Sequence, residues 1–239
     1  MKALIVHSSD PVTLLGGGAA LTTDVHEALS IAPRCVAADG GAELARRSGV
    51  TPEAVIGDFD SISPETLDLT PAARQMRIAE QDSTDFDKAL RHIAAPVVVG
   101  VGFTGARMDH QLAALHVLAA HAHRPCVLLG ATEVLFLCPP RIRIDTRAGD
   151  VVSLFPLAPV AGTSEGLRWP IAGLGFAPMS RIGTSNLATG PLTLTMDAPA
   201  MLVLLPRAHL AAVTRALGSA PQAARWTARA GQYTAPTHS

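Results

Sequence analysis

The sequence is poor in several features that mark particular classes of protein. Aromatic residues make up only 4% of its 239 residues, which argues against a surface that stacks the bases of single-stranded nucleic acid. The formal net charge is -1, so we expect no nucleic-acid binding through bulk positive charge. The three cysteines (Cys35, Cys126 and Cys138) form no CxxC pair, which argues against a disulfide scaffold or a structural zinc site.

Long apolar runs are also missing from the sequence. The run around 198–205 is interrupted by proline and is far shorter than the roughly 20 residues that cross a bilayer. The apolar stretch after Met1 is too short for the core of a signal peptide. We therefore expect a cytoplasmic protein with reduced thiols and no membrane partner.

Apolar residues make up 48% of the chain, enough to bury a substantial core. In the first half, short runs rich in valine and leucine alternate with helical patterns, as is typical of parallel strands covered on both faces. The patterns predict strands at 2–7, 35–38, 54–56, 97–101 and 126–129. They predict helices at 24–30, 42–48, 84–93 and 109–121, the last with an apolar stripe of leucines at 112, 115 and 118.

The second half changes character after about residue 130. Segments 141–145 and 192–196 alternate polar and apolar residues, as antiparallel strands with one wet face do. We expect an α/β protein with an N-terminal, mostly parallel sheet and flanking helices, followed by a C-terminal all-β sandwich domain. The domains expected are 1–131, 132–207 and a C-terminal extension, 208–239, that is partly helical or disordered.

Four polar clusters follow the strands of the first half, where the carboxyl ends of parallel strands form ligand sites. In the first, Asp39 precedes Gly40 and Gly41, which allow backbone to approach a ligand but also suit a plain turn. In the second, Asp58 and Asp60 would present both carboxylates to one side of an extended segment. Such a pair favours bound Mg²⁺, and the alternative is an acidic turn before a helix.

The third cluster lies at the start of an expected helix. Asp82, Asp85 and Asp87 crowd the first turn, where the helix dipole favours negative charge, and the hydroxyl at 83 or 84 can cap the helix. Lys88 follows Asp85 by three residues and so lies on the same helix face. These acids are either ordinary N-terminal helix residues or, with the ammonium, a site for a cation and a phosphate.

The fourth cluster is the loop 102–110, whose glycines and Arg107 suit a polyphosphate, although such loops are common. His110 fits either a general base or a structural role. His121 has no carboxylate at ligand spacing, and we expect it on the helix surface. Together the clusters predict Mg²⁺-dependent phosphoryl chemistry without a P-loop, because GxxxxGK[ST] is absent. Gly16–Gly18 lacks the spacing of a dinucleotide motif.

Five segments carry a resemblance to a known family. They are Asp39-Gly40-Gly41, GDFDS at 57–61, DSTDFDKAL at 82–90, RMDH at 107–110 and GTSN at 183–186. In order and spacing the chain resembles the thiamine pyrophosphokinases over about residues 1–206. The resemblance implies a homodimer that uses Mg²⁺ to transfer the diphosphoryl group of ATP to the hydroxyl of thiamine, leaving AMP.

The resemblance also implies roles for single residues. The metal ligands that it implies are Asp58, Asp60 and Asp85, and the catalytic residues are these three together with Lys88 and Asp109. The nucleotide and polyphosphate contacts that it implies are Asp39, Gly40, Gly41, Gln81 and Arg107. The thiamine contacts that it implies are Trp169, Ser185 and Asn186. The sequence departs from the family at Ala106, where a second glycine usually precedes the arginine.

Two other functions stay open at this stage. One is a diphosphokinase for another hydroxymethyl heterocycle such as a pterin. The other is a thiamine or nucleotide sensor without catalysis, which would have little need for the aspartates and Lys88. Either Asp85 or Asp109 could accept the hydroxyl proton. The partners expected are thiamine and ATP as small-molecule substrates.

Overall fold

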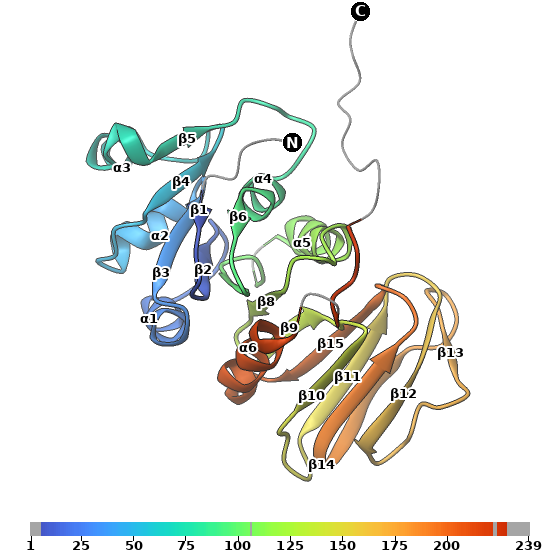
Figure 1. Ribbon diagram of the computed structural model, residues 1–239. Helices are drawn as coiled ribbons and strands as arrows, with labels where there is room; N and C mark the ends of the chain where they lie inside the picture. Colours follow the sequence, from blue (N-terminus) through green and yellow to red (C-terminus); the bar gives the residue numbers. More distant parts are fainter. Residues whose placement is uncertain (1–5, 106, 222–223, 229–239) are drawn as a thin grey trace, which may run out of the picture.

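The computed structural model describes residues 6–105, 107–221 and 224–228. At its centre, β2 (Val12–Leu15), β7 (Val98–Val101) and β8 (Cys126–Leu129) run parallel, and β9 (Glu133–Leu137) pairs antiparallel with β8 (Figure 1). The parallel strands β3 (Arg34–Ala38), β4 (Ala54–Gly57) and β5 (Gln75–Arg77) lie beyond β2, which bridges to the residue before β3.

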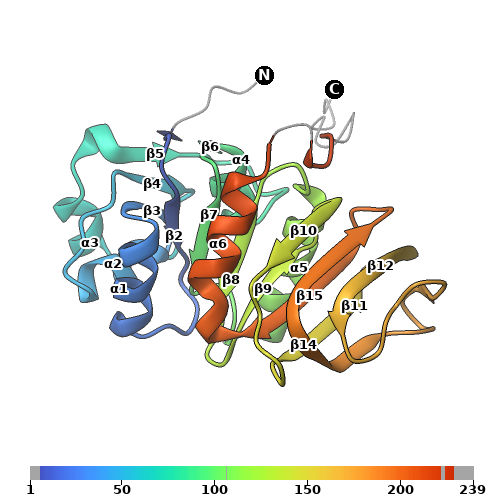
Figure 2. The ribbon, with the colours of Figure 1, turned by 60° about the horizontal axis from the view of Figure 1, so that its bottom comes forward.

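Alternating side chains of the central strands face two layers of helices. Leu15 and Val99 belong to one core cluster, whereas their neighbours Leu14 and Val98 belong to another, as the period of a strand requires. The first cluster includes residues of α1 (Thr22–Ile31), α2 (Gly41–Arg47) and α6 (Leu210–Ser219). The second includes residues of α4 (Asp85–Arg91) and α5 (Met108–Ala120). Figure 2 shows α1, α2 and α6 in front of the sheet.

The sheet continues without a break into the antiparallel half. Here β15 (Met201–Pro206) pairs with β9, and β11 (Val151–Pro156) pairs with β15. The long strand β14 (Gly183–Met196) pairs first with β11 and then with β10 (Arg141–Ile144) and β12 (Val160–Leu167). The short strand β13 (Gly175–Phe176) lies outside β12. The chain is therefore α/β with one large mixed sheet.

Most strands and helices expected in the first half are confirmed, but its first strand is not the expected one. The described part of 2–7 forms only the two-residue β1 (Val6–His7), which pairs with β6 (Ile93–Ala94). The strand that enters the central sheet is β2, which is buried throughout. The sequence pattern missed it because Thr13 interrupts its apolar run and a proline directly precedes it.

The leucine stripe expected on α5 is also wrong. Leu118 is buried, but Leu112 is 59% exposed. The buried face is formed instead by the smaller side chains of Ala114 and Val117 with Leu118. Three residues are less than one helical turn, so a strict spacing of three rotates around the helix.

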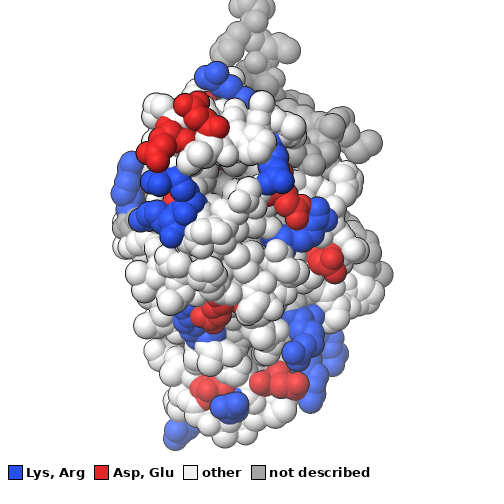
Figure 3. Space-filling model, turned by 90° about the vertical axis from the view of Figure 1, so that its left-hand side faces the viewer, with Lys and Arg blue, Asp and Glu red and all other residues white. Residues whose placement is uncertain are grey.

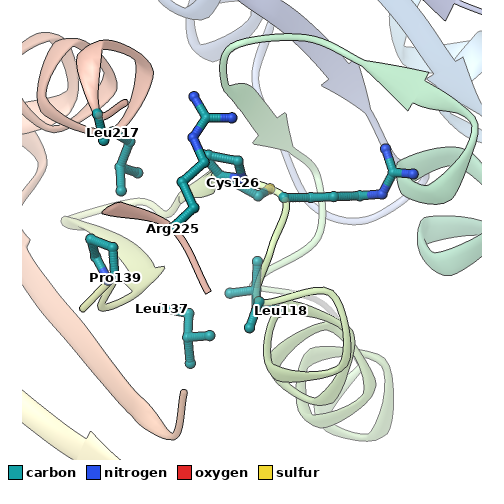
Figure 4. Close-up of a pocket in the computed structure, with 10 residues that line it drawn as sticks. Leu118, Cys126, Leu137, Pro139, Leu217 and Arg225 are labelled. Carbon is teal, nitrogen blue, oxygen red and sulfur yellow. The ribbon is translucent and has the colours of Figure 1, made fainter. Parts of the chain in front are cut away.

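The C-terminal extension packs on both cores. After η2 (Arg207–His209) and α6, Trp226 contacts both core clusters and donates a hydrogen bond from Nε1 to the Cys138 carbonyl at 2.9 Å. Figure 4 shows Arg225 and Leu217 beside a small cavity of about 20 Å³ over Cys126. The rest of the extension, 229–239, lies outside the described residues.

Within the described part of the chain, no helix combines the length and apolar character needed to cross a membrane.

Cys35, Cys126 and Cys138 are buried as free thiols. Burial raises the pKa of Cys35 to about 12, so this thiol is protonated at neutral pH, as an inert structural cysteine is. The expected reduced, buried cysteines are confirmed.

We expect Trp226→Ala to lower the free energy of unfolding by about 2 kcal/mol, because it removes a large side chain that contacts both cores. Trp169→Ala is the matched control, since that indole is 54% exposed, and we expect a change below about 0.5 kcal/mol. Urea unfolding followed by circular dichroism measures both. Equal losses in the two variants would contradict the anchoring role of Trp226.

Candidate active site

The two strands β3 and β4 each end in an aspartate-bearing turn. Asp39 follows β3 and is buried, with a positive φ of 41°. Its carboxylate accepts hydrogen bonds from the backbone N–H groups of Phe59, at 2.8 Å, and Ser61, at 3.1 Å. Phe59 itself has a φ of 70°, a conformation uncommon for a residue with a side chain. Asp39 thus fixes the tight turn that carries Asp58 and Asp60.

This turn brings together the first group of predicted site residues. One carboxylate oxygen from each of Asp39, Asp58 and Asp60 lies within 4.8 Å of the others. Asp58 and Asp60 lie close together as expected. The expected extended segment is wrong, however, because a tight turn brings the two carboxylates together. Three carboxylate oxygens at this spacing fit Mg²⁺, which prefers hard oxygen ligands.

The helix α4 adds Lys88 and Asp85 to this cluster. Thr84 caps the helix, accepting a hydrogen bond from the N–H of Asp87 at 3.2 Å. The Lys88 side chain is almost fully buried, and its ammonium donates to Asp58 at 2.6 Å and to Asp85 at 3.2 Å.

Gln81 joins the same cluster from the segment before α4. Its side-chain amide donates to Asp58 at 3.3 Å. The predicted residues Asp58, Asp60, Gln81, Asp85 and Lys88 therefore meet at one edge of the sheet, with the ammonium between two of the carboxylates.

The cluster shifts the acidity of its members in opposite directions. Burial raises the pKa of Asp39 to about 6, and the charge of Asp85 adds to this effect. Burial also raises the pKa of Asp85. The hydrogen bond from Lys88 lowers the pKa of Asp58. Burial alone would lower the pKa of Lys88, but the contacts with Asp58 and Asp85 outweigh it and leave the pKa raised.

A buried contact between a carboxylate and an imidazole holds α4 against the end of α5. Asp87 is 1% exposed, and its carboxylate contacts the His121 imidazole at 2.5 Å and the Arg91 guanidinium at 3.4 Å. The expectation that His121 lies on the helix surface is therefore wrong. The sequence pattern missed this pair because its members are 34 positions apart and meet only through packing.

A glycine segment that lacks the spacing of a dinucleotide motif adjoins the site. Gly16–Gly18 directly follows β2, and Gly18 donates its N–H to the carbonyl of Gly102 at 2.8 Å. A Cβ on Gly17 would lie 3.4 Å from Gly40, so these turns are in close contact. A Cβ on Gly41 would meet the Leu15 carbonyl oxygen at 2.0 Å, so Gly41 is needed for packing. Recognising β2 would have placed this segment at the site.

Arg107 and Asp109 begin α5 and are well exposed, and they pair with each other at 2.5 Å. The side-chain partner that the structure gives Arg107 is Asp109, whose pKa the guanidinium lowers. The structure does not bring this pair into contact with the carboxylates of the cluster within the described residues. Ala106 lies outside those residues.

The predicted thiamine contacts meet in a different place. Trp169, Ser185 and Asn186 line an open groove of about 370 Å³ at the strands β12–β14. Both ribbon views place β3–β5 at one end of the molecule and β12 at the other, with β13 beside β12 in Figure 1 (Figures 1 and 2). Figure 3 views the end with β3–β5, where acidic and basic side chains lie next to one another across the described surface.

A family model matches the part of the chain that carries the carboxylate cluster. Residues 25–129 match the model described as the catalytic domain of thiamin pyrophosphokinase, and this range contains every predicted residue of the carboxylate cluster. The family model, the curated relatives and the solved structures all support the thiamine pyrophosphokinase family for this chain. The resemblance drawn from the sequence motifs is thereby confirmed.

Individual members of the thiamine pyrophosphokinase family are similar to the chain. It is 28% identical over 163 residues to thiamine pyrophosphokinase 1 of Arabidopsis thaliana, covering 60% of the chain and 61% of that relative. It is 27% identical over 180 residues to thiamine pyrophosphokinase 3 of rice, covering 66% and 67%. The match thus spans about three-fifths of the length of the Arabidopsis relative.

Solved structures of the family extend the likeness to the whole architecture. The thiamin pyrophosphokinase of Geobacillus thermodenitrificans superposes with a TM-score of 0.66 and 25% identity, over 82% of this chain and 96% of that one. The Candida albicans enzyme has a TM-score of 0.70 at 16% identity, over 84% and 92%, which shows the fold alone. Both halves of the mixed sheet therefore belong to the family fold.

The raised pKa of Asp39 predicts a pH dependence in metal-free protein. Between about pH 4 and 6 the folded state binds a proton that the unfolded state, with an ordinary pKa of 3.8, has released. The contribution of Asp39 to the free energy of unfolding therefore falls as pH rises through this window. Urea titrations in EDTA should show a smaller fall in Asp39→Asn than in the wild type. The same slope in both proteins would refute the assignment.

Proposed function

We propose that the chain transfers the diphosphoryl group of ATP to the hydroxyl of thiamine, giving thiamine diphosphate and AMP. The observation that carries the proposal is the cluster in which Asp58 contacts Lys88 and lies beside Asp39 and Asp60. It lies within the segment that matches the family's catalytic domain. Concentrated carboxylates with one buried ammonium suit a metal-bound polyphosphate better than a neutral ligand.

We propose that Mg²⁺ is held by Asp58, Asp60 and Asp85. Asp39, with both oxygens accepting backbone N–H groups, shapes the turn on which the first two stand. When bound, the ion neutralises phosphate charge and holds the polyphosphate for in-line attack. Lys88, whose ammonium lies between Asp58 and Asp85, would donate to a phosphate oxygen.

The glycine turns and the loop before α5 form the nucleotide side of the proposed site. Gly40 and Gly41 with Asp39 line the nucleotide pocket, and Gln81 contacts the polyphosphate. Arg107 reaches a phosphate, and its exposed pair with Asp109 keeps the guanidinium oriented until then. The acceptor of the hydroxyl proton in this proposal is Asp85 or Asp109.

The separation of the two candidate sites supports a homodimer as the working unit. The groove with Trp169 lies at the end of the molecule away from the carboxylates, so one copy does not join both substrates. In a two-fold dimer the groove of one copy can complete the carboxylate site of the other. We further propose that 1–131 forms the catalytic domain, 132–207 a β-sandwich domain that binds thiamine, and that the protein is cytoplasmic.

Purified protein with ATP, Mg²⁺ and thiamine should produce AMP and thiamine diphosphate, both dependent on thiamine, as followed by ³¹P NMR. Asp58→Asn should lower turnover by at least about 100-fold, because it removes charge at the proposed metal site. Asp68→Asn is the matched control, since Asp68 is exposed on α3 (Pro64–Leu69) away from the cluster. Near-full turnover of Asp58→Asn at saturating Mg²⁺ would overturn the metal assignment.

The alternatives have their own signatures in the same assay. ADP in place of AMP would rule out diphosphoryl transfer. Thiamine binding without turnover would indicate a sensor, and turnover with a hydroxymethyl pterin in place of thiamine would indicate the other heterocycle.

A shared site predicts complementation between two inactive variants. When equal amounts of Asp58→Asn and Trp169→Ala subunits exchange at random, half of the dimers contain one subunit of each variant. Each of these dimers has one site that combines a wild-type carboxylate cluster with a wild-type groove. We expect about a quarter of the wild-type turnover, with little from either variant alone. Size-exclusion chromatography with light scattering checks that dimers form. A mixture no more active than its parents would contradict a site built by two copies.

A further inference from the structure

We propose that Asn186 is a positioning residue that holds the backbone of Trp169, and that Ser185 is the polar residue of this pair that faces the substrate. The inference rests on the proposed function, because it concerns how the groove presents Trp169 to a flat heterocycle. It differs from the role that the family resemblance implies, in which both residues contact the substrate.

The Asn186 carboxamide is committed to the protein backbone. Its Oδ1 accepts the N–H of Trp169 at 3.2 Å and the N–H of Leu187 at 2.8 Å. Its Nδ2 donates to the carbonyl of Trp169 at 2.8 Å. Asn186 is only 8% exposed, as expected of a side chain whose partners are internal. The carboxamide therefore brackets both backbone polar groups of Trp169.

This bonding limits what Asn186 can offer a substrate. An amide oxygen has two lone pairs, and both are used by Trp169 and Leu187. It cannot accept a hydrogen bond from an exocyclic amino group without releasing one of these N–H groups. Releasing a buried donor costs about as much as a new hydrogen bond returns.

The indole that Asn186 positions is well placed for stacking. Trp169 is 54% exposed, on the groove, so its ring is not fixed by burial in a core. The Arg168 guanidinium lies 5.0 Å from the ring centroid. A half-exposed ring on a loop moves with its backbone unless that backbone is held, and two hydrogen bonds with Asn186 hold the backbone of Trp169.

Ser185 has the opposite character. It is exposed and lines the same groove, and its φ is 62°. Its backbone N–H donates to Ser153 Oγ at 3.0 Å, which holds the strained residue in place. The strand β14 therefore turns one side chain, Asn186, inward to the backbone of Trp169 and leaves the hydroxyl of Ser185 at the groove.

The test uses the full chain with Trp226→Phe, so that Trp169 is the sole indole. In this background Asn186→Ala should lower the steady-state fluorescence anisotropy of Trp169 without any ligand. Ser185→Ala, the matched control, should leave it unchanged. Should Asn186→Ala fail to fold, Asn186→Asp, which keeps the acceptor and loses the donor to the Trp169 carbonyl, should lower it to a smaller extent.

A second readout separates positioning from direct recognition. Thiamine and its analogue with a 4-oxo group in place of the 4-amino group are titrated against each variant. Asn186→Ala should weaken both by the same factor, about tenfold, leaving their ratio within about twofold of the parent's. Loss of affinity for thiamine alone would mean that Asn186 contacts the amino group, and would overturn the proposal.

Failure of the proposed function is visible separately. If the parent protein binds neither compound, thiamine is not its substrate, and the anisotropy in ligand-free protein still decides whether Asn186 positions Trp169. Unchanged anisotropy in folded Asn186→Ala would refute the positioning role whatever the substrate is.

Discussion

The burial of one positive charge makes the carboxylate-rich edge of this protein possible. Four aspartates (Asp39, Asp58, Asp60 and Asp85) gather around the ends of β3, β4 and α4, and like charges held this close repel one another. Lys88 is almost fully buried and contacts two of them. Burial alone would lower the pKa of this ammonium, its contacts with Asp58 and Asp85 raise it, and its hydrogen bond lowers the pKa of Asp58. The folded chain thus contains its own counterion where a metal-bound polyphosphate is proposed to bind.

The remaining structure keeps that charge in place. Thr84 starts α4 at the right residue, and Asp87 with His121 fixes α4 against α5. Asp39 holds the turn after β4 by accepting hydrogen bonds from two backbone N–H groups, and its own φ is positive, which is uncommon for a residue with a side chain. Strained backbone of this kind persists only where the surroundings determine it, which is why it gathers at sites.

Much of this arrangement could be predicted from the sequence, and the failures have physical causes. Valine-rich runs predicted β3, β4, β7 and β8 because buried parallel strands need no polar partner. Asp58, Asp60, Asp85 and Lys88 were found because they belong to local motifs with fixed spacing. The β2 strand was missed because Thr13 interrupts its apolar run and Pro11 directly precedes it.

Contacts between distant segments lay beyond sequence reasoning. The pair of Asp87 and His121 exists only once α4 and α5 pack, and no local spacing signals it. The bonds of Asn186 to the backbone of Trp169 likewise join residues 17 positions apart. Motif matching assigns such a residue to the ligand by default, because it sees the side-chain type and not the partner that already occupies it.

The order of strands also governs how the chain can fold during its synthesis. β15 lies between β9 and β11, yet it is made some 65 residues after β9 and 45 after β11. Until it emerges, both strands expose an unpaired edge, and exposed edges are where chains join one another and aggregate. Pairing that waits for distant sequence is slow. The nascent chain therefore passes through a vulnerable interval that ends only when β15 inserts and closes the sheet.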